Sequence, residues 1–244
     1  MTQPHARITA SFSIFVSTVI AALSILDSTS VFAQTQVAHH LILERSAFFS
    51  GRIPPPRQVN VWLTNDKLRM DDGRSAAVWR IDLGKTYTFG VRGSEYRERP
   101  LTDSNLFGAD LKDSTRYEWS ISPLGVDSTQ KALPMRVYEF LGQTERNEIE
   151  ARARVAPTLP SSLAKYCNAQ LLPFWMTKDQ WTLLSKTDPL LTTSVIVSVE
   201  WSTNGGEARD AFRLLRYEVV ESSGEQFEPP KGAVLAPSDN KERR

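Results

Sequence analysis

The sequence predicts an α+β fold in which a large, curved antiparallel sheet carries helices against one face. Three observations predict this fold class. Residues 38–101 alternate apolar and polar side chains with a period of two, and turn signals interrupt the alternation, as in a meander of short strands. Apolar residues recur at helical spacing between residues 160 and 190, and residues 195–220 return to the alternation of strands. Helices packed against one face of a sheet satisfy this order of elements.

Turn signals divide the first sheet segment into strands. Asp72-Gly73 predicts a hairpin, because both residue types tolerate the positive φ angles that a two-residue turn needs. Asp82-Leu83-Gly84 predicts the next turn. The alternation on either side places Leu68 and Met70 on one face of a strand, and the next strand is expected to return beside it.

The later elements are predicted with mixed periodicity. Residues 123–131 begin with proline and are expected to form a loop, whereas residues 137–155 are expected to form a solvated hairpin. Residues 163–171 carry apolar side chains at helical spacing, and residues 177–180 have the capping-box pattern of a second helix. Asn204-Gly205 predicts a tight turn between the last two strands.

The composition is that of a folded domain and excludes several function classes. The 244 residues include 29 Lys+Arg and 28 Asp+Glu, and 41% of them are hydrophobic. A formal net charge of +1 provides no electrostatic surface for nucleic acid as a main partner. The single cysteine excludes an intramolecular disulfide framework and an all-cysteine metal site.

The first 33 residues have the pattern of a cleaved secretory signal peptide. Arg7 precedes a mostly apolar stretch over residues 8–26, and Val31 and Ala33 stand three and one positions before the expected cleavage site after Ala33. We therefore expect a periplasmic protein with a single domain over residues 34–235 and a disordered tail over 236–244. Secretion from the cell and N-terminal anchoring by an uncleaved segment are the alternatives.

Few side chains could support catalysis. Once the signal is removed, the histidines are His39 and His40, which on a strand would point to opposite faces and could not hold one metal ion together. Cys167 occupies an apolar helical position and is expected to be a buried hydrophobic residue. The glycine-rich motifs of nucleotide-binding loops are absent. We therefore predict no catalytic residue, no metal site and no cofactor, although a carboxylate pair of the hydrolase type stays open.

A surplus of apolar and aromatic side chains indicates a hydrophobic ligand. Val61 and Leu63 point to one face of their strand while Trp62 points to the other. Either the sheet is packed on both faces, by helices on one and by a partner or a loop on the other, or its concave face holds an apolar ligand under a helical lid. The candidate cavity residues are Leu68, Met70, Trp79, Tyr87, Phe89, Val197 and Trp201; the candidate lid residues are Trp181 and Leu184; and the candidates for binding an anionic headgroup are Arg69 and Arg80.

Several segments resemble one family of exported bacterial proteins. These segments are Val61-Trp62-Leu63-Thr64-Asn65-Asp66-Lys67-Leu68-Arg69-Met70-Asp71-Asp72-Gly73, Trp79-Arg80-Ile81-Asp82-Leu83-Gly84-Lys85-Thr86-Tyr87, Tyr96-Arg97-Glu98-Arg99-Pro100-Leu101 and Phe227-Glu228-Pro229-Pro230-Lys231-Gly232. They are similar to the LolA/LolB-like superfamily of periplasmic lipoprotein carriers, and most of all to its uncharacterised exported members. Ala233 stands where an aromatic residue is usual in that closing motif. The resemblance implies a half-barrel of about eleven antiparallel strands around an apolar cavity that helices close.

These observations predict a non-catalytic periplasmic binding or carrier protein for an acyl chain or another lipid-like ligand. Its expected partners are that hydrophobic ligand, an envelope protein and, transiently, a membrane, with no nucleic acid. Two alternatives stay open. One is a structural or interaction module of the envelope whose own side chains fill the core, and the other is a carboxylate-dependent hydrolase.

Overall fold

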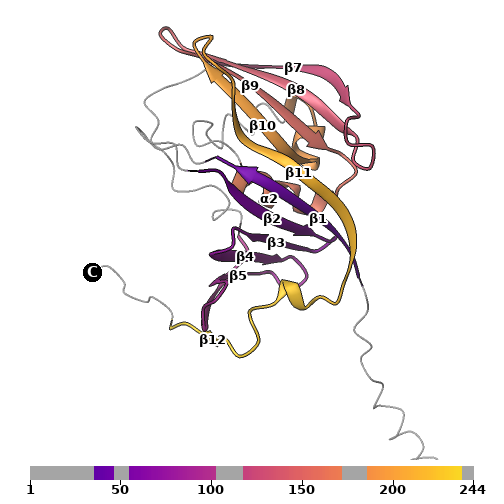
Figure 1. Cartoon of the computed structure of the whole chain (residues 1–244), viewed down its shortest axis with the longest axis vertical. Coiled ribbons are helices and arrows are strands. Elements are labelled where there is room, and N and C mark those ends of the chain that lie inside the picture. The colour runs from indigo at the N-terminus through magenta and orange to yellow at the C-terminus, as the bar shows by residue number, and fades with distance from the viewer. Residues whose placement is uncertain (1–35, 47–54, 103–117, 172–185, 238–244) are drawn as a thin grey trace, which may run out of the picture. The chain divides into compact units, whose positions relative to one another are not determined.

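The computed structural model describes residues 36–46, 55–102, 118–171 and 186–237. The strands of this part of the chain form one twelve-stranded sheet in the order β12-β6-β5-β4-β3-β2-β1-β11-β10-β9-β8-β7 (Figure 1). The strands are β1 (Gln36–Arg45), β2 (Arg57–Leu63), β3 (Lys67–Asp71), β4 (Ser75–Arg80), β5 (Lys85–Gly90), β6 (Glu95–Pro100), β7 (Glu118–Asp127), β8 (Met135–Gln143), β9 (Glu148–Ala156), β10 (Val195–Thr203), β11 (Arg209–Ser222) and β12 (Val234–Leu235). Neighbouring strands are antiparallel except β12, which runs parallel to β6.

The predicted meander of short strands is confirmed from β2 to β6. Asp72 and Gly73 turn the chain between β3 and β4, where the amide of Asp72 donates to the carbonyl of Ser75 over 3.1 Å and Gly73 has a φ of 80°. Asn204 and Gly205, with φ angles of 52° and 66°, lie in the tight turn after β10. These turns form where the sequence predicts them, because positive φ is a local property of the residue type.

The prediction of residues 123–131 as a loop is wrong for 123–127, which lie in β7, and is confirmed for 128–131, which follow the strand. Pro123 lies inside β7, which is an edge strand of the described sheet, and the pairing with β8 shifts between Pro123 and Gly125. Proline is tolerated there because an edge strand leaves one row of amides without a ladder partner and a bulge absorbs the irregularity. The expected hairpin between β8 and β9 is present, but one of its faces is buried rather than solvated, as Tyr138, Phe140 and Ala153 show.

The α+β half-barrel with helices covering its concave face is not what the structure shows. The described chain forms a large open mixed sheet, with β12 and β7 at its two edges. Its main helix, α2 (Ala164–Leu171), has eight residues, and α4 (Leu190–Thr193) has four. An eight-residue helix is about 12 Å long, whereas twelve strands span about 50 Å. The helical periodicity at 163–171 therefore marks a helix too short to cover the sheet.

One face of the sheet carries the larger apolar core, and we call it the core face. Antiparallel register aligns Leu41, Val61 and Met70 across β1, β2 and β3. Helix α2 packs against this core through residues that include Leu163, just before the helix, and Cys167. These side chains form one hydrophobic cluster, which consists of Leu41, Leu43, Val59, Val61, Leu63, Leu68, Met70, Trp79, Leu133, Met135, Tyr138, Phe140, Ala151, Ala153, Val155, Ala156, Leu159, Leu163, Ala164, Tyr166, Cys167, Leu191, Val195, Ile196, Val197, Val199, Ala211 and Phe212.

A buried amide holds α2 to the sheet. The side chain of Asn168 donates to the carbonyl of Ser194 over 2.9 Å and accepts from the amide of Ile196 over 2.8 Å. Both groups belong to the chain that enters β10, and the Asn168 side chain satisfies them away from water. This polar contact sets the position of α2 more specifically than the surrounding apolar packing does.

The opposite face of β3–β6 is covered by the C-terminal segment, and we call it the strap face. The strap is residues 223–237, which include the short helix η3 (Glu225–Phe227) and strand β12 (Figure 1). Phe227 is fully buried in a second cluster with Ala38, Ala76, Val78, Tyr87 and Phe89. Gly224, at a φ of 85°, turns the chain from β11 into the strap.

The ion pair at the end of β7 makes a testable contribution to acid stability. Asp127 accepts hydrogen bonds from the amide and hydroxyl of Thr129 over 2.9 and 2.7 Å and from Arg154 over 2.9 Å. The Thr129 hydroxyl and amide, together with Arg154, lower the pKa of Asp127 from 3.8 to about 2. Because the folded-state pKa is the lower one, the contribution is complete above about pH 4 and is lost as the pH falls towards 2.

We therefore expect Asp127→Asn to flatten the pH dependence of thermal unfolding between about pH 4 and pH 2. Melting curves across this range, monitored by circular dichroism, measure the effect. Glu145→Gln is the matched control, because it also removes one carboxylate but lies in the exposed turn between β8 and β9. Its pH dependence of thermal unfolding should be that of wild type. Identical profiles for wild type and Asp127→Asn would contradict the assignment.

Candidate functional site

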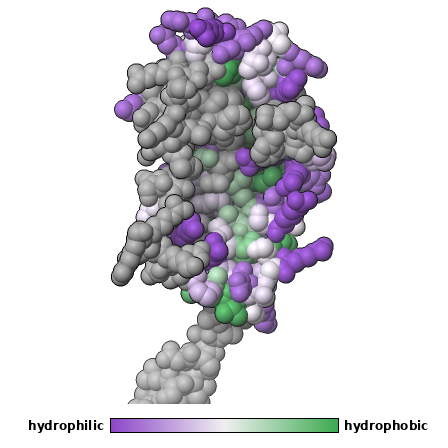
Figure 2. Space-filling view, turned by 90° about the vertical axis from the view of Figure 1, so that its left-hand side faces the viewer, coloured by the Kyte–Doolittle hydropathy of each residue, from purple (hydrophilic) through white to green (hydrophobic). Residues whose placement is uncertain are grey.

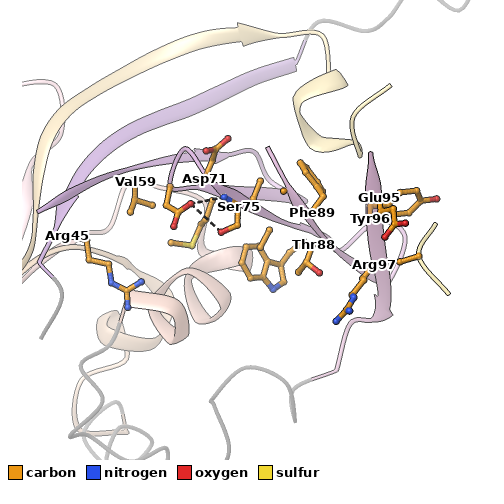
Figure 3. Close-up of a pocket in the computed structure, with 16 residues that line it drawn as sticks. Arg45, Val59, Asp71, Ser75, Thr88, Phe89, Glu95, Tyr96 and Arg97 are labelled. Atoms are coloured by element: carbon orange, nitrogen blue, oxygen red, sulfur yellow. Dashed lines mark hydrogen bonds between the residues drawn. The ribbon is translucent and has the colours of Figure 1, made fainter. Parts of the chain in front are cut away.

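A pocket of about 510 Å³ lies beside strands β2 to β6 (Figure 3). It is lined by Arg45, Val59, Met70, Asp71, Asp72, Ser75, Ala76, Ala77, Trp79, Thr88, Phe89, Gly90, Glu95, Tyr96, Arg97 and Ala236. Most of these residues belong to β3, β4, β5 and β6, so the meander predicted from turn chemistry supplies most of the wall. The last residue comes from the strap, which reaches the pocket at the β6 edge of the sheet.

The register of the sheet gives the pocket a continuous floor on the core face. Met70 lies opposite Ala77, Ala77 lies opposite Thr88, and Thr88 lies opposite Arg97. Directly opposed residues of antiparallel strands point to the same side of a sheet. The floor is therefore a row that crosses β3 to β6, with an apolar part on β3 and β4 and a polar part on β5 and β6.

Arg45 and Arg97 stand at opposite ends of this pocket, with Thr88 between them on the same side of the sheet (Figure 3). Arg45 ends β1 and Arg97 lies in β6, which is five strands away in the order of the sheet. Five inter-strand steps of about 4.8 Å give a separation of about 24 Å. The pocket thus has the form of a groove that crosses the strands, and it suits an elongated ligand.

Figure 2 shows the hydrophobic character of one side of the molecule. Hydrophobic residues gather in a band through the middle and lower parts of this view, and hydrophilic residues border the band (Figure 2). Within the pocket, Val59, Met70 and Trp79 are almost fully buried and Ala77 is half-buried. The apolar groups of the floor therefore continue the core of the sheet rather than forming a separate patch.

Two of the pocket carboxylates are held by neighbouring groups. Asp71 accepts from Arg69 over 2.6 Å and from the amide of Gly73 over 2.7 Å. Asp72 accepts from the amides of Arg74 and Ser75 over 3.0 and 2.8 Å within its own turn. Burial is the largest single effect on Asp72 and raises its pKa, but the amides of Ser75 and Arg74, the hydroxyl of Ser75 and the charge of Arg57 together outweigh it and lower the pKa. The Asp72 carboxylate therefore stays ionised at neutral pH.

Three of the seven predicted cavity residues line the pocket. Met70 and Trp79 do so on the core face. Phe89 also lines it, but its ring points away from Thr88, and it packs in the cluster of the strap face (Figure 3). The other four predicted cavity residues lie elsewhere: Leu68 and Val197 are fully buried in the core, Trp201 packs against that core, and Tyr87 is buried on the strap face.

Arg69 and Arg80 do not line the pocket, and both bind the strap instead. Arg69 donates to the carbonyl of Gln226 over 2.9 Å as well as to Asp71. Arg80 contacts Glu228 and donates to Asp82 over 2.8 and 2.6 Å. Their predicted role in binding a headgroup is not supported by these positions, because their guanidinium groups are used within the protein.

The predicted lid residues, Trp181 and Leu184, lie outside the described residues, as does the signal-peptide segment 1–33. Within the described ranges, no helix is both long enough and apolar enough to cross a membrane. The pocket residues that sequence reasoning missed include Arg45, Ala77 and Thr88. The strand alternation puts Ala77 and Trp79 on one face, but the cross-strand register that adds Thr88 and Arg45 is a property of the fold.

The side chains most suited to covalent or metal chemistry are placed away from the pocket. Cys167 is fully buried, as predicted, and burial raises the pKa of its thiol to about 12. His39 contacts the hydroxyl of Tyr217 at 3.0 Å, whereas His40 contacts Glu218 at 2.9 Å and stacks on Trp62. The residues that the structure describes contain no group of three or more histidine, cysteine, aspartate or glutamate side chains arranged to hold a metal ion.

Together the fold and pocket describe a β-sheet protein with an open, partly apolar groove on one face. No family model matches the chain, and no curated protein matches it. Nine chains of solved structures match. One of them is a structure of PNGF-II, with a TM-score of 0.41 and 11% sequence identity over 82% of this chain. The match covers 31% of the PNGF-II chain, so this protein spans less than a third of its length.

Proposed function

We propose that the protein is an exported, non-catalytic binding or carrier protein for an acyl chain or a similar elongated hydrophobic ligand. The observation that carries this proposal is the groove across β2–β6, whose floor includes Val59, Met70, Ala77 and Trp79. Its volume of about 510 Å³ lies within the range of about 300–1,000 Å³ that small-molecule sites occupy. The export itself rests on the signal-peptide pattern of residues 1–33.

Binding would be driven by removal of the ligand's apolar surface from water. Burial of apolar area contributes about 25 cal/mol per Å², so a chain that buries about 200 Å² gains about 5 kcal/mol before the entropic costs of association. A preformed floor on β-strands lowers those costs, since Met70 and Trp79 are already held by the core. No bond is made or broken, and the ligand would leave as it entered. A transient membrane contact or an envelope partner would then supply or receive the ligand.

We expect Ala77→Phe to weaken binding at least tenfold by filling the floor of the groove. A phenyl ring at this half-buried position occupies the space between Met70 and Thr88, which are its cross-strand neighbours. N-phenylnaphthylamine, an uncharged fluorescent probe of apolar sites, measures the binding by titration. An uncharged probe separates the apolar contribution from any contact with charged side chains.

Val219→Phe is the matched control, because it adds the same ring at a residue of β11 that is 58% exposed and lies outside the pocket. This variant should bind the probe as wild type does. Circular dichroism of both variants checks that the sheet is intact. If wild type does not bind the probe, or if both variants bind as wild type does, the proposal fails and the envelope interaction module is favoured.

A further inference from the structure

We propose that the ligand of this groove is an anionic amphiphile whose acidic headgroup binds the guanidinium of Arg45. The inference rests on the proposed function and adds the chemical class of the ligand. Arg45 is the last residue of β1, and it shares the core face with Leu43 two positions earlier. The cation therefore stands where the apolar row of β1 ends, as a site for a molecule with one charged end requires.

The surroundings of Arg45 favour an incoming anion. Its guanidinium stands at one end of the groove, clear of the strap face (Figure 3). Within the described ranges, the carboxylate of Asp72 is an acidic group whose charge acts on it. One oxygen of that carboxylate already accepts from the amides of Arg74 and Ser75 and from the hydroxyl of Ser75. Asp72 therefore contributes an electrostatic field at Arg45 but is held in place by its own turn.

The local charge at this end of the groove also favours an anion. Arg57 is directly opposite Arg45 in the pairing of β1 with β2, and its charge acts on Asp72 as well. Two cations thus face one carboxylate. Arg45 is an exposed residue at the end of β1, so its guanidinium is accessible to an anion that arrives from solvent. A guanidinium binds a carboxylate or phosphate that can accept two parallel hydrogen bonds from its planar fork.

The apolar part of the same molecule would follow the floor of the groove. From Arg45 the lining continues through Val59 and Met70 to Ala77 and Trp79, which are apolar. The acidic end of an amphiphile would therefore bind Arg45, and its apolar chain would lie along the apolar residues of the floor. Arg97 is at the far end of the groove, beyond the polar Thr88, and is not needed for this arrangement.

Palmitate and hexadecanol test the inference, because they have chains of the same length and differ in the charge of the end group. Each ligand is titrated against N-phenylnaphthylamine in the wild-type groove, and displacement of the probe gives the affinity of the ligand. We expect the affinity for palmitate to be roughly ten- to a hundredfold higher than the affinity for hexadecanol. Arg45→Gln should lower the affinity for palmitate to about that for hexadecanol, so that the preference is lost. Arg45→Lys should retain part of the preference, because it keeps the charge but loses the planar fork.

Arg74→Gln is the matched control, since it removes one charge from the exposed turn beside Asp72 without changing a residue that lines the pocket. It should keep at least half of the wild-type preference for palmitate. Equal binding of palmitate and hexadecanol to wild type would overturn the inference while the proposed function stands. The same conclusion follows if Arg45→Gln weakens both ligands alike. Failure of wild type to bind the uncharged probe at all would instead overturn the proposed function.

Discussion

Replacing Arg69 with methionine is expected to lower the free energy of unfolding by about 3–5 kcal/mol. Arg69 pairs with Asp71, whose side chain is only 10% exposed, and donates to the carbonyl of Gln226 in the strap. Its guanidinium also lies between the rings of Trp62 and Phe89, at 5.4 and 5.6 Å from their centroids. Arg69→Met keeps the apolar stem but leaves the Asp71 carboxylate without its cation, so a desolvated charge remains unpaired.

The double variant Arg69→Met with Asp71→Asn separates the unpaired charge from the lost packing. Removal of both charges should recover a large part of the stability, because the remaining amide needs far less solvation than a carboxylate. Urea unfolding of wild type, the single variant and the double variant measures this difference. If the single variant unfolds at the wild-type urea concentration, Arg69 is a solvated arginine and its structural role here is wrong.

Phe227→Ala is expected to cost about 3–5 kcal/mol and to release the strap from the sheet. The Phe227 ring is fully buried against Val78 and Phe89, so its removal leaves a cavity in the centre of a small cluster. The other contacts of the strap are the hydrogen bond from Arg69 to the carbonyl of Gln226, the ion pair of Glu228 with Arg80, and the short pairing of β12 with β6. Without the ring, these contacts are too few to hold the segment closed.

Two measurements distinguish release of the strap from general destabilisation. Urea unfolding reports the loss of stability, and trypsin cleavage after Lys231, an exposed residue of the strap, reports local opening under native conditions. Val234→Ala removes a side chain of the same strap that is 66% exposed, and it should change neither result appreciably. Cleavage of Phe227→Ala at the wild-type rate would show that the ring does not hold the strap.

The turns and most strands could be predicted from the sequence because their signals are local. Asp72-Gly73 and Asn204-Gly205 adopt the conformations that their residue types favour, and the alternation between such turns identifies the strands. The same reasoning failed at Pro123, where the residue is compatible with a strand because the strand lies at an edge. Whether a strand is central or at an edge depends on pairing with distant segments.

The fold class was wrong for a related reason. The helical spacing of residues 163–171 correctly indicated α2 and the burial of Cys167, but periodicity carries little information about how much of a sheet a helix can cover. The extent of the sheet follows from twelve strands that pair over the whole described chain, including β1 with β11. Those pairings are long-range, and local sequence patterns do not specify them.

The sequence by itself determined the positions of the turns, the alternation of the strands and two residues of the groove floor, Met70 and Trp79. Only the tertiary structure decided that Arg69 and Arg80 hold the strap while Arg45 stands at the groove. The physical reason is the range of the interactions. Backbone preference and alternation act between neighbours in the chain, whereas the partner of a charged side chain depends on which distant segment the sheet brings to the same face.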